Sequence, residues 1–390
     1  MTIIDWYLPG FKAGGPIRSV ANMISALGTE ACEFYVITRD RDLKDSHPYQ
    51  GVPLGSWTKV GHGNVLYMRS HSMARLRRRI NEVCPDVIYM NSFFSRLTIK
   101  ILLLRRLGLI PPCAMVVAPR GEFSPGALAL KKTKKKLFMA LASGVGLYRK
   151  ILWHASAERE KQEIEKVWKS APIHVASDFP QYQLADNPQA HRPQKKSGEV
   201  RFVFISRVSP MKNLDFAIDL VCRLKGNVTF DIYGPAEDAS YFEQCQRAIA
   251  QAPEGVTIRF IGPVEHEEAK SKFYEYHFFL FPTRGENFGH VIVEALAAGC
   301  PAIISDQTPW VDLERQEVGW NLALNDLARW QQVLQNCVDM DGANYSEMSR
   351  RATQFLKDWV QSPKIRQQNV ELFKHSLAMN SVKKGEEVSA

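Results

Sequence analysis

The chain has 390 residues, of which 45% are hydrophobic and 23% charged, and its formal net charge is +9. This length predicts two domains or slightly more, and this composition is that of a folded protein. No run of about eighteen apolar residues occurs, and no basic segment followed by an apolar core opens the chain, so we expect neither a transmembrane helix nor a signal peptide.

The cysteines and the distribution of charge indicate where the protein acts. Its seven cysteines are scattered without a Cys-x-x-Cys pair, which favours a reducing cytoplasm and offers no zinc motif. Residues 1–180 hold 27 Lys and Arg against 14 Asp and Glu, whereas residues 181–390 hold 23 against 27. Since the basic surplus lies wholly in the first half, we expect that half to meet an anionic surface.

The first half opens with a short apolar strand, expected over residues 2–8, and a glycine-rich loop. Gly14 and Gly15 precede a helix over about residues 17–27, and adjacent glycines let a phosphate approach the backbone at a helix start. Arg18 could reach such a phosphate; a simple tight turn is the alternative. The short first strand is compatible with a natural start farther upstream. Apolar runs at 34–38, 65–68, 86–91 and 115–118 continue the rhythm of a parallel sheet.

Three basic clusters lie on predicted helices of this half. Residues 75–79 and 100–109 interleave basic with apolar residues, and we interpret both as solvated helix faces. The segment from Lys131 to Lys136 holds five lysines and runs into an apolar stretch. A helix with one basic and one apolar face suits an anionic lipid surface, so we expect this segment to hold the protein on the inner face of the cell membrane. No recognition motif points to nucleic acid.

A polar loop at residues 118–127 contains Arg120 and Glu122 and follows a predicted strand. Either these side chains face a ligand at the carboxyl end of that strand, or they form a local structural pair. The next apolar strand carries His154, which we interpret as a core histidine. A last apolar run at 173–176 completes the half.

Residues 180–199 are rich in Pro, Gln, Asn and Lys, which is typical of an interdomain linker. A continuous apolar strand at 200–205 follows. Arg207 and Lys212, just beyond it, can place two cations on one pyrophosphate, although solvated loop charges are the alternative. Further strands are expected at 227–233 and 257–261.

The segment 277–304 reads as a buried strand, a polar loop, a helix and a second strand. Glu286 lies in the loop and Glu294 in the helix, among apolar neighbours. The first N–H groups of that helix, at residues 288–291, form an anion seat. Amide donors for phosphate and carboxylates for hydroxyls suit a sugar nucleotide. The alternative is that Glu286 is a solvated loop acid and Glu294 a surface residue, but a charge in an apolar helix favours a partner.

The sequence Glu-Asn-Phe-Gly-His-Val-Ile-Val-Glu, residues 286–294, followed by Ala-Leu-Ala-Ala-Gly-Cys-Pro, resembles the E-x7-E signature of retaining GT-B glycosyltransferases, especially family 4, of the type that builds bacterial surface polysaccharides. The resemblance implies an α/β fold of two Rossmann-like domains facing each other across a cleft. Applied to this chain, it predicts an acceptor-binding domain at 1–179, the linker at 180–199, a donor-nucleotide domain at 200–362, a helix at 363–379 that returns to the first domain, and a tail at 380–390.

The resemblance also implies roles for the residues singled out above. Arg207 and Lys212 match the cations that bind donor phosphates, Glu286 would hold the transferred sugar, and Glu294 the ribose. The expected catalytic residues are therefore Glu286, Arg207 and Lys212. The expected binding residues are Gly14, Gly15, Arg18, Arg120, Glu122, Pro263, Val264, Asn287, Phe288, Gly289, His290 and Glu294.

Two parts of that set rest on the family alone. The turn at Pro263 and Val264 would cradle the nucleobase through its backbone. The Pro-Arg-Gly segment lines the cleft in relatives, so that Arg120 would contact donor phosphate or acceptor and Glu122 an acceptor hydroxyl. Many relatives carry a histidine in this region, which this chain lacks.

The expected reaction moves a sugar from a nucleoside diphosphate sugar to a hydroxyl of a glycan or polyprenyl-linked acceptor, in the synthesis of O-antigen, capsule or lipopolysaccharide. Asp40-Arg41-Asp42 resembles the metal-binding Asp-x-Asp of the GT-A fold, but its flanks do not. GT-B enzymes generally act without a catalytic metal, so we expect neither metal nor cofactor. Two alternatives stay open: a sugar-nucleotide 2-epimerase of the same architecture, and a non-catalytic polysaccharide- or lipid-binding module.

Overall fold

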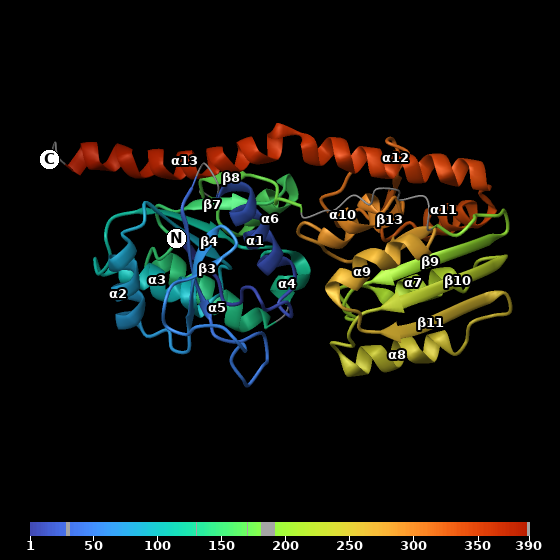
Figure 1. Cartoon of the computed structure of the whole chain (residues 1–390), viewed down its shortest axis with the longest axis horizontal. Coiled ribbons are helices and arrows are strands. Elements are labelled where there is room, and N and C mark those ends of the chain that lie inside the picture. The colour runs from blue at the N-terminus through green and yellow to red at the C-terminus, as the bar shows by residue number, and fades with distance from the viewer. Residues whose placement is uncertain (29–31, 130, 170, 181–191, 388–390) are drawn as a thin grey trace. The chain divides into compact units, whose positions relative to one another are not determined.

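The computed structural model describes residues 1–28, 32–129, 131–169, 171–180 and 192–387. The chain forms two compact units, one made of residues 1–181 and 363–390 and the other of residues 182–362. Each unit contains one sheet of mostly parallel strands covered by helices (Figure 1). Within the described residues, no helix is both long enough and apolar enough to cross a membrane.

The sheet of the first unit has eight strands in the order β3-β4-β2-β1-β5-β6-β7-β8. Neighbouring strands run parallel except β3, which pairs antiparallel with β4. The strands are β1 (Thr2–Ile3), β2 (Phe34–Arg39), β3 (Thr58–Val60), β4 (Gly63–Met68), β5 (Val87–Asn91), β6 (Ala114–Ala118), β7 (Leu152–Ala155) and β8 (Ile173–Val175). The helices are α1 (Gly15–Leu27), α2 (Met73–Val83), α3 (Arg96–Arg106), α4 (Pro125–Ala129), α5 (Lys132–Gly144), α6 (Glu158–Val167) and α13 (Pro363–Glu387).

The first strand is shorter than its apolar pattern predicts. β1 covers Thr2–Ile3 instead of residues 2–8. The chain still follows β2 beyond Ile3, since the Ile4 N–H donates to the Ile37 carbonyl and the Arg39 N–H to the Asp5 carbonyl, both at 3.2 Å. The Arg39 Nε and Nη2 atoms also donate to the Asp5 carboxylate at 3.0 and 2.7 Å.

The C-terminal helix α13 belongs to the first unit and packs against β5, β6, β7 and β8. Its Phe373 ring contacts the rings of Phe34 and Tyr89 from the sheet. The helix continues to Glu387 instead of giving way to the tail predicted at 380–390. The lysines and glutamates of this stretch are good helix formers, and extending an existing helix needs no new nucleus.

The sheet of the second unit has six parallel strands in the order β11-β10-β9-β12-β13-β14. The strands are β9 (Glu199–Ile205), β10 (Asn227–Tyr233), β11 (Val256–Gly262), β12 (Phe278–Phe281), β13 (Ala302–Ser305) and β14 (Gly319–Leu322). The helices are α7 (Leu214–Val221), α8 (Ala239–Ile249), α9 (His266–Lys272), α10 (His290–Ala297), α11 (Leu327–Asp339) and α12 (Gly342–Gln361). β12 is buried throughout, and β9 is buried except at Glu199 and Arg201, as continuous apolar runs predict for central strands.

Most of the predicted linker lies outside the described residues, at 181–191. The described part, 192–198, packs on the second unit. The Lys195 Nζ donates to the carbonyls of Val338 and Met340 at 2.9 and 2.7 Å, and the residue is only 4% exposed. Burial lowers the pKa of Lys195. The compositional signal therefore placed the end of the linker too late, because a lysine can be buried when backbone carbonyls surround its ammonium group.

Candidate functional site

Two loops meet at the point where the strand order of the second unit reverses. From β9 the chain proceeds outward through β10 and β11, then returns to place β12 on the other side of β9. The loops after β9 and β12, residues 206–213 and 282–289, therefore leave the same edge of the sheet side by side. In open α/β sheets, this switch point at the carboxyl ends of the strands is where ligands bind.

Hydrogen bonds hold the two loops together. The Arg284 backbone N–H and the Thr283 hydroxyl both donate to the carbonyl of Met211, at 2.8 and 3.1 Å. The side-chain amide of Asn213 donates to the carbonyl of Pro282 at 2.9 Å. The loops thus form one preorganised surface instead of two independent segments.

Lys212 and Glu286 form an ion pair across the loops. The Lys212 Nζ lies 2.6 Å from a Glu286 carboxylate oxygen, and the side chains are 11% and 20% exposed. The same ammonium lies 5.2 Å from the centroid of the Phe281 ring, at the end of β12. The pair is partly desolvated, which strengthens its electrostatics, yet both groups keep a surface that solvent reaches. The two residues lie 74 positions apart in the sequence, and the fold brings them together.

The start of α10 adds amide groups beside this pair. Gly289 has φ +83°, and a Cβ at this position would lie 2.8 Å from Cδ1 of Ile292. Only glycine fits such a close turn without strain. The helix begins at His290, and the N–H groups of its first turn suit an anion, although that of Ile292 also donates to the Gly289 carbonyl at 2.9 Å.

The remaining residues of the E-x7-E segment have distinct positions. Phe288 is buried against Trp310 and Trp359, so its side chain serves the core and only its backbone is available for a ligand. The indole N–H of Trp310 donates to the Phe288 carbonyl at 2.7 Å, which fixes the loop. Glu294 is 9% exposed within α10. Asn287 and His290 are half-buried at the loop's end.

Arg207 stands at the beginning of the first loop and binds Glu237. Two Nη1–carboxylate distances of 3.0 and 3.1 Å join them, and the Arg207 side chain is 48% exposed. Exposed pairs of this kind contribute little to stability, so Arg207 can exchange partners at small cost in free energy. Pro263 and Val264 follow the edge strand β11; Pro263 is exposed and Val264 half-buried.

Comparison with known proteins shows the fold. The chain superimposes on the crystal structure of WaaG, a glycosyltransferase involved in lipopolysaccharide biosynthesis, with a TM-score of 0.66, 11% identity, and coverage of 95% of this chain and 98% of that one. HepE of Anabaena, in complex with UDP-glucose, gives 0.67 and 15% identity over 96% and 98% of the two chains. The sucrose-phosphate synthase of Thermosynechococcus elongatus gives 0.69 and 12% over 100% and 99%. The fold is GT-B.

The sequence of the second unit carries the family signal of this GT-B chain. Residues 186–354 match the model of the glycosyl transferases group 1 family. A curated relative, the D-inositol 3-phosphate glycosyltransferase of Jonesia denitrificans, is 23% identical over 169 residues, which span 39% of this chain and 40% of that protein. The GT-B fold is thus found in both units, whereas the family model matches mainly the second.

Two residues of the GT-B site escaped the sequence analysis. Asn213 adopts a left-handed backbone conformation at φ +60° just before α7, and its Oδ1 accepts from the Arg284 Nε at 2.9 Å. This hydrogen bond fixes the exposed Arg284 beside the two loops as a further cation. Asparagine before an apolar helix was the available signal, because it tolerates the left-handed region.

The glycine-rich loop lies in the first GT-B unit. Gly14 has φ +71° and precedes α1, and an added Cβ would meet no atom within 4 Å. Its neighbouring backbone is held by Asp42, whose Oδ2 accepts from the N–H groups of Phe11 and Lys12 at 2.7 and 3.0 Å. Asp42 of the Asp-x-Asp segment thus caps a loop. Gly15 begins the helix, and Arg18 is half-buried in its first turn.

Arg120, for which a ligand role is expected, is engaged within the protein. Its guanidinium is 6% exposed and donates to Asp178, to Asn91 Oδ1 at 2.8 Å and to the Tyr89 hydroxyl at 2.8 Å. Asp178 in turn accepts from the Ser19 hydroxyl at 2.6 Å. All three of its nitrogen atoms are therefore used by the protein, and the side chain ties β5 and β6 to the segment after β8.

Glu122 is likewise engaged internally and does not pair with Arg120. Its oxygens accept from the Ser92 hydroxyl at 2.7 Å and from the backbone N–H groups of Phe93 and Phe94. Burial raises the pKa of Glu122 in spite of these bonds. The alternative of a local Arg120–Glu122 pair is wrong, because each side chain bonds to other residues, and the ligand roles of both stay predictions.

Proposed function

We propose that this protein is a retaining glycosyltransferase that moves a sugar from a nucleoside diphosphate sugar to a hydroxyl of a glycan or lipid-linked acceptor. The observation that carries the proposal is the Lys212–Glu286 pair at 2.6 Å, held at the switch point of the second unit beside the start of α10. It brings a cation, a carboxylate and amide donors to one edge of one sheet. A sugar diphosphate needs each of these groups.

The chemistry follows from where charge develops. When the bond between the anomeric carbon and the diphosphate breaks, its electron pair passes to the leaving phosphate oxygen. Lys212, Arg207 and the first N–H groups of α10 receive that charge, which is electrostatic stabilisation by preorganised groups and requires no metal. In the ligand-free protein Lys212 is neutralised by Glu286. A bound diphosphate becomes a second anion for the same ammonium.

The two glutamates hold hydroxyls in this proposal. Glu286 accepts hydrogen bonds from the sugar that is transferred, and Glu294 from the ribose of the nucleotide. The acceptor hydroxyl attacks from the face that the diphosphate leaves, so the anomeric configuration is retained and the acceptor proton passes to the departing phosphate. We name no protein nucleophile, and the mechanism uses none.

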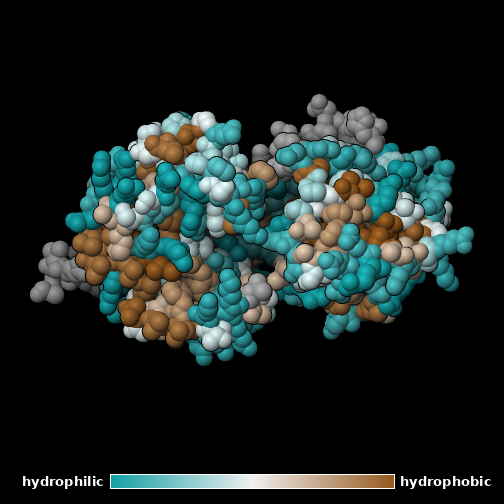
Figure 2. All heavy atoms as spheres, turned by 90° about the horizontal axis from the view of Figure 1, so that it is seen from below, coloured by the Kyte–Doolittle hydropathy of each residue, from teal (hydrophilic) through white to brown (hydrophobic). Residues whose placement is uncertain are grey.

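The first unit supports a lipid-linked acceptor at a membrane surface. Leu137 and Leu141 on α5 and Val145 after it are 62%, 61% and 56% exposed, next to the lysines of 131–136. Apolar side chains gather widely on the visible face of this unit, at the left of Figure 2. Each basic residue near an anionic lipid surface contributes about 1 kcal/mol, and the exposed leucines would enter the headgroup region.

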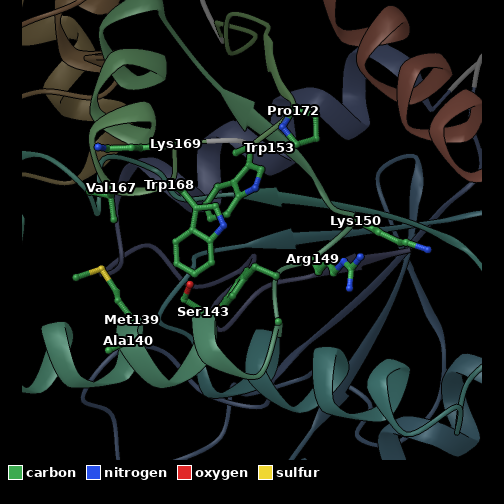
Figure 3. A pocket seen from close by; sticks show the side chains of 13 residues that line it. Met139, Ala140, Ser143, Arg149, Lys150, Trp153, Val167, Trp168, Lys169 and Pro172 are labelled. Atoms are coloured by element: carbon green, nitrogen blue, oxygen red, sulfur yellow. The ribbon is translucent and has the colours of Figure 1, made fainter.

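An open pocket of about 620 Å³ lies beside α5. Figure 3 shows the indoles of Trp153 and Trp168 next to Ser143 of α5, with Lys169 on one side and Arg149 and Lys150 on the other. The indole centroids are 5.7 Å apart. An apolar floor with cations around it favours an amphiphile with an anionic head. This supports peripheral attachment and a role in surface polysaccharide synthesis.

The test of the transferase is a screen of donors. The protein is heated with a panel of UDP- and GDP-sugars, and the donor that raises its melting temperature is then incubated with and without acceptor glycans. Transfer with retention supports the proposal. An epimer formed from the donor alone supports a sugar-nucleotide epimerase instead, and no nucleotide affinity at all contradicts both enzymes.

Membrane attachment is tested separately by flotation with anionic vesicles. Replacing Lys132, Lys134 and Lys136 by glutamate should abolish flotation while the donor's thermal shift is kept. Unchanged flotation of this variant would contradict the role of α5.

A further inference from the structure

Four arginines line a second pocket of the first unit, with a volume of about 380 Å³. Arg69 follows the last residue of β4, and Arg75, Arg78 and Arg79 lie on α2. The rest of the lining is Leu54, Gly55, Tyr67, Met68 and Ser70, without a carboxylate. The segment 75–79, interpreted from the sequence as a solvated helix face, therefore contributes three of its four arginines to a concave site, and Arg77 remains outside the lining.

The wall of this pocket is built by specific hydrogen bonds. The Arg79 Nη1 donates to Glu82 at 2.7 Å and its Nη2 donates to the carbonyl of Gly55 at 2.6 Å. The Gly55 N–H donates to the carbonyl of Tyr67 at 2.9 Å. The loop before β3, the strand β4 and the helix α2 are thereby fixed to one another around the opening.

The positive charge of the pocket is compensated only in part: Arg69 interacts electrostatically with Asp40, which is itself bonded to Arg41. Glu82 is the acid nearest along α2, and the hydrogen bond from Arg79, followed by the charge of that arginine and of Arg78, lowers its pKa. Glu82 is therefore ionised and cancels one charge. In the described part of the chain, Arg69, Arg75 and Arg78 make no ion pair with any carboxylate, and all three are exposed. Cations that share a cavity repel each other unless an anion joins them.

The chemistry and the position of the pocket both point to phosphate. A guanidinium presents two parallel N–H groups that match two phosphate oxygens, and several arginines around a cavity recognise a phosphoryl group from different sides. Met68 ends β4, so the pocket opens at the carboxyl edge of the first sheet. That is the edge at which α/β sheets bind ligands.

We propose that this arginine pocket binds a phosphate-bearing group. Resting on the function proposed above, we assign this group to the acceptor, which is then a phosphorylated glycan or the diphosphate of a lipid-linked one. The diphosphate of the donor binds elsewhere, at Lys212 of the second unit.

The experiment measures binding of inorganic pyrophosphate to the full-length protein by titration calorimetry. All samples carry Lys212→Ala, which weakens the donor's diphosphate seat. Adding Arg75→Ala together with Arg78→Ala should weaken binding about 100-fold, since each charge-assisted contact is worth about tenfold. The matched control is Arg77→Ala, an exposed arginine of the same helix, which should change binding by less than about twofold. Equal binding by all three proteins, or an equal loss with Arg77→Ala, would overturn the site.

A second measurement separates the sources of the phosphate. Phosphatidylcholine vesicles with and without a polyprenyl phosphate are floated with the protein carrying intact arginines and with the Arg75→Ala/Arg78→Ala variant. Recruitment that depends on both the lipid phosphate and the arginines identifies a lipid-borne ligand; pyrophosphate binding without recruitment identifies a soluble one. In transfer assays the same variant should raise the acceptor KM and leave the donor's thermal shift unchanged. If no transfer is found but pyrophosphate binding is still lost in the variant, the pocket stands and the proposed function fails.

Discussion

The same tripeptide, Arg-Gly-Glu, follows a central parallel strand in each unit, but the exposure and the partners of its charged side chains differ between the units. After β6 it supplies Arg120, whose guanidinium is 6% exposed and saturated by Asp178, Asn91 and Tyr89. After β12 it supplies Arg284, which is exposed, and Glu286, which is 20% exposed and bound to Lys212.

The difference teaches how to tell structural charges from ligand-binding ones. Both tripeptides lie at the carboxyl end of a strand, so position in the fold does not separate them. What separates them is whether the protein itself uses every donor and acceptor. A buried charge whose partners are complete holds the fold together, and a partly exposed charge with a single partner can take a ligand.

The largest effect on stability is expected from removing Arg120, whose side-chain nitrogen atoms all have partners within the protein. Arg120→Ala removes a buried cation that Asp178 binds, which should lower the free energy of unfolding by about 3–5 kcal/mol. Arg284→Ala, the matched arginine of the other tripeptide, should cost about 1 kcal/mol or less, because the side chain is exposed. Denaturant unfolding measures both. Similar losses in the two variants would remove the distinction drawn above.

The next effect concerns turnover. Lys212→Ala and Glu286→Ala should each reduce turnover about 100-fold or more, because the first no longer stabilises the charge of the leaving group and the second no longer holds the transferred sugar. Their melting temperatures should stay close to that of the unchanged protein. Lys225→Ala, an exposed lysine of the same unit, is the control and should keep full activity. Near-normal turnover in Lys212→Ala would contradict the assignment of the site.

A smaller effect is expected from two glycines with left-handed backbone. Gly289→Ala combines φ +83° with a contact of 2.8 Å to Ile292 and should lower the free energy of unfolding by about 2 kcal/mol. Gly14→Ala has φ +71° but open space around the new methyl group, so only the backbone term of about 1 kcal/mol applies. Thermal melts of both variants measure the difference. An equal or larger loss in Gly14→Ala would argue against tight packing at the start of α10.

Near neutral pH, the smallest effect is a dependence of stability on pH in both units. Burial lowers the pKa of His154 to about 4 and that of His277 to about 3, from 6.5. Between those values the unfolded chain binds protons that the folded chain refuses, so stability is complete above about pH 6.5 and falls as the pH drops toward 4. Each histidine contributes at most about 1.4 kcal/mol per pH unit. His154→Gln should flatten the slope of denaturant stability against pH; an unchanged slope would contradict the burial of that charge.

Much of the fold was predictable because its signals are local. The apolar runs of β9 and β12 are long enough to identify buried parallel strands, and Gly299 with Pro301 marks the end of α10. The segment 286–294 was recognisable as well, since a glycine turn and an apolar helix fix the spacing of its two glutamates. The strand β3 was missed because its three residues, Thr58, Lys59 and Val60, lie at a sheet edge and form no apolar run.

What the sequence by itself determined, then, is the order of elements and the identity of the charged loops. Only the tertiary structure decided which charged residues form ion pairs. Arg120 pairs with Asp178, 58 residues away, and Lys212 pairs with Glu286, 74 residues away. Arg69 joined the arginines of α2 around one pocket. A side chain's partner depends on which strands become neighbours in the sheet, and that ordering results from the packing of the whole unit rather than from local sequence.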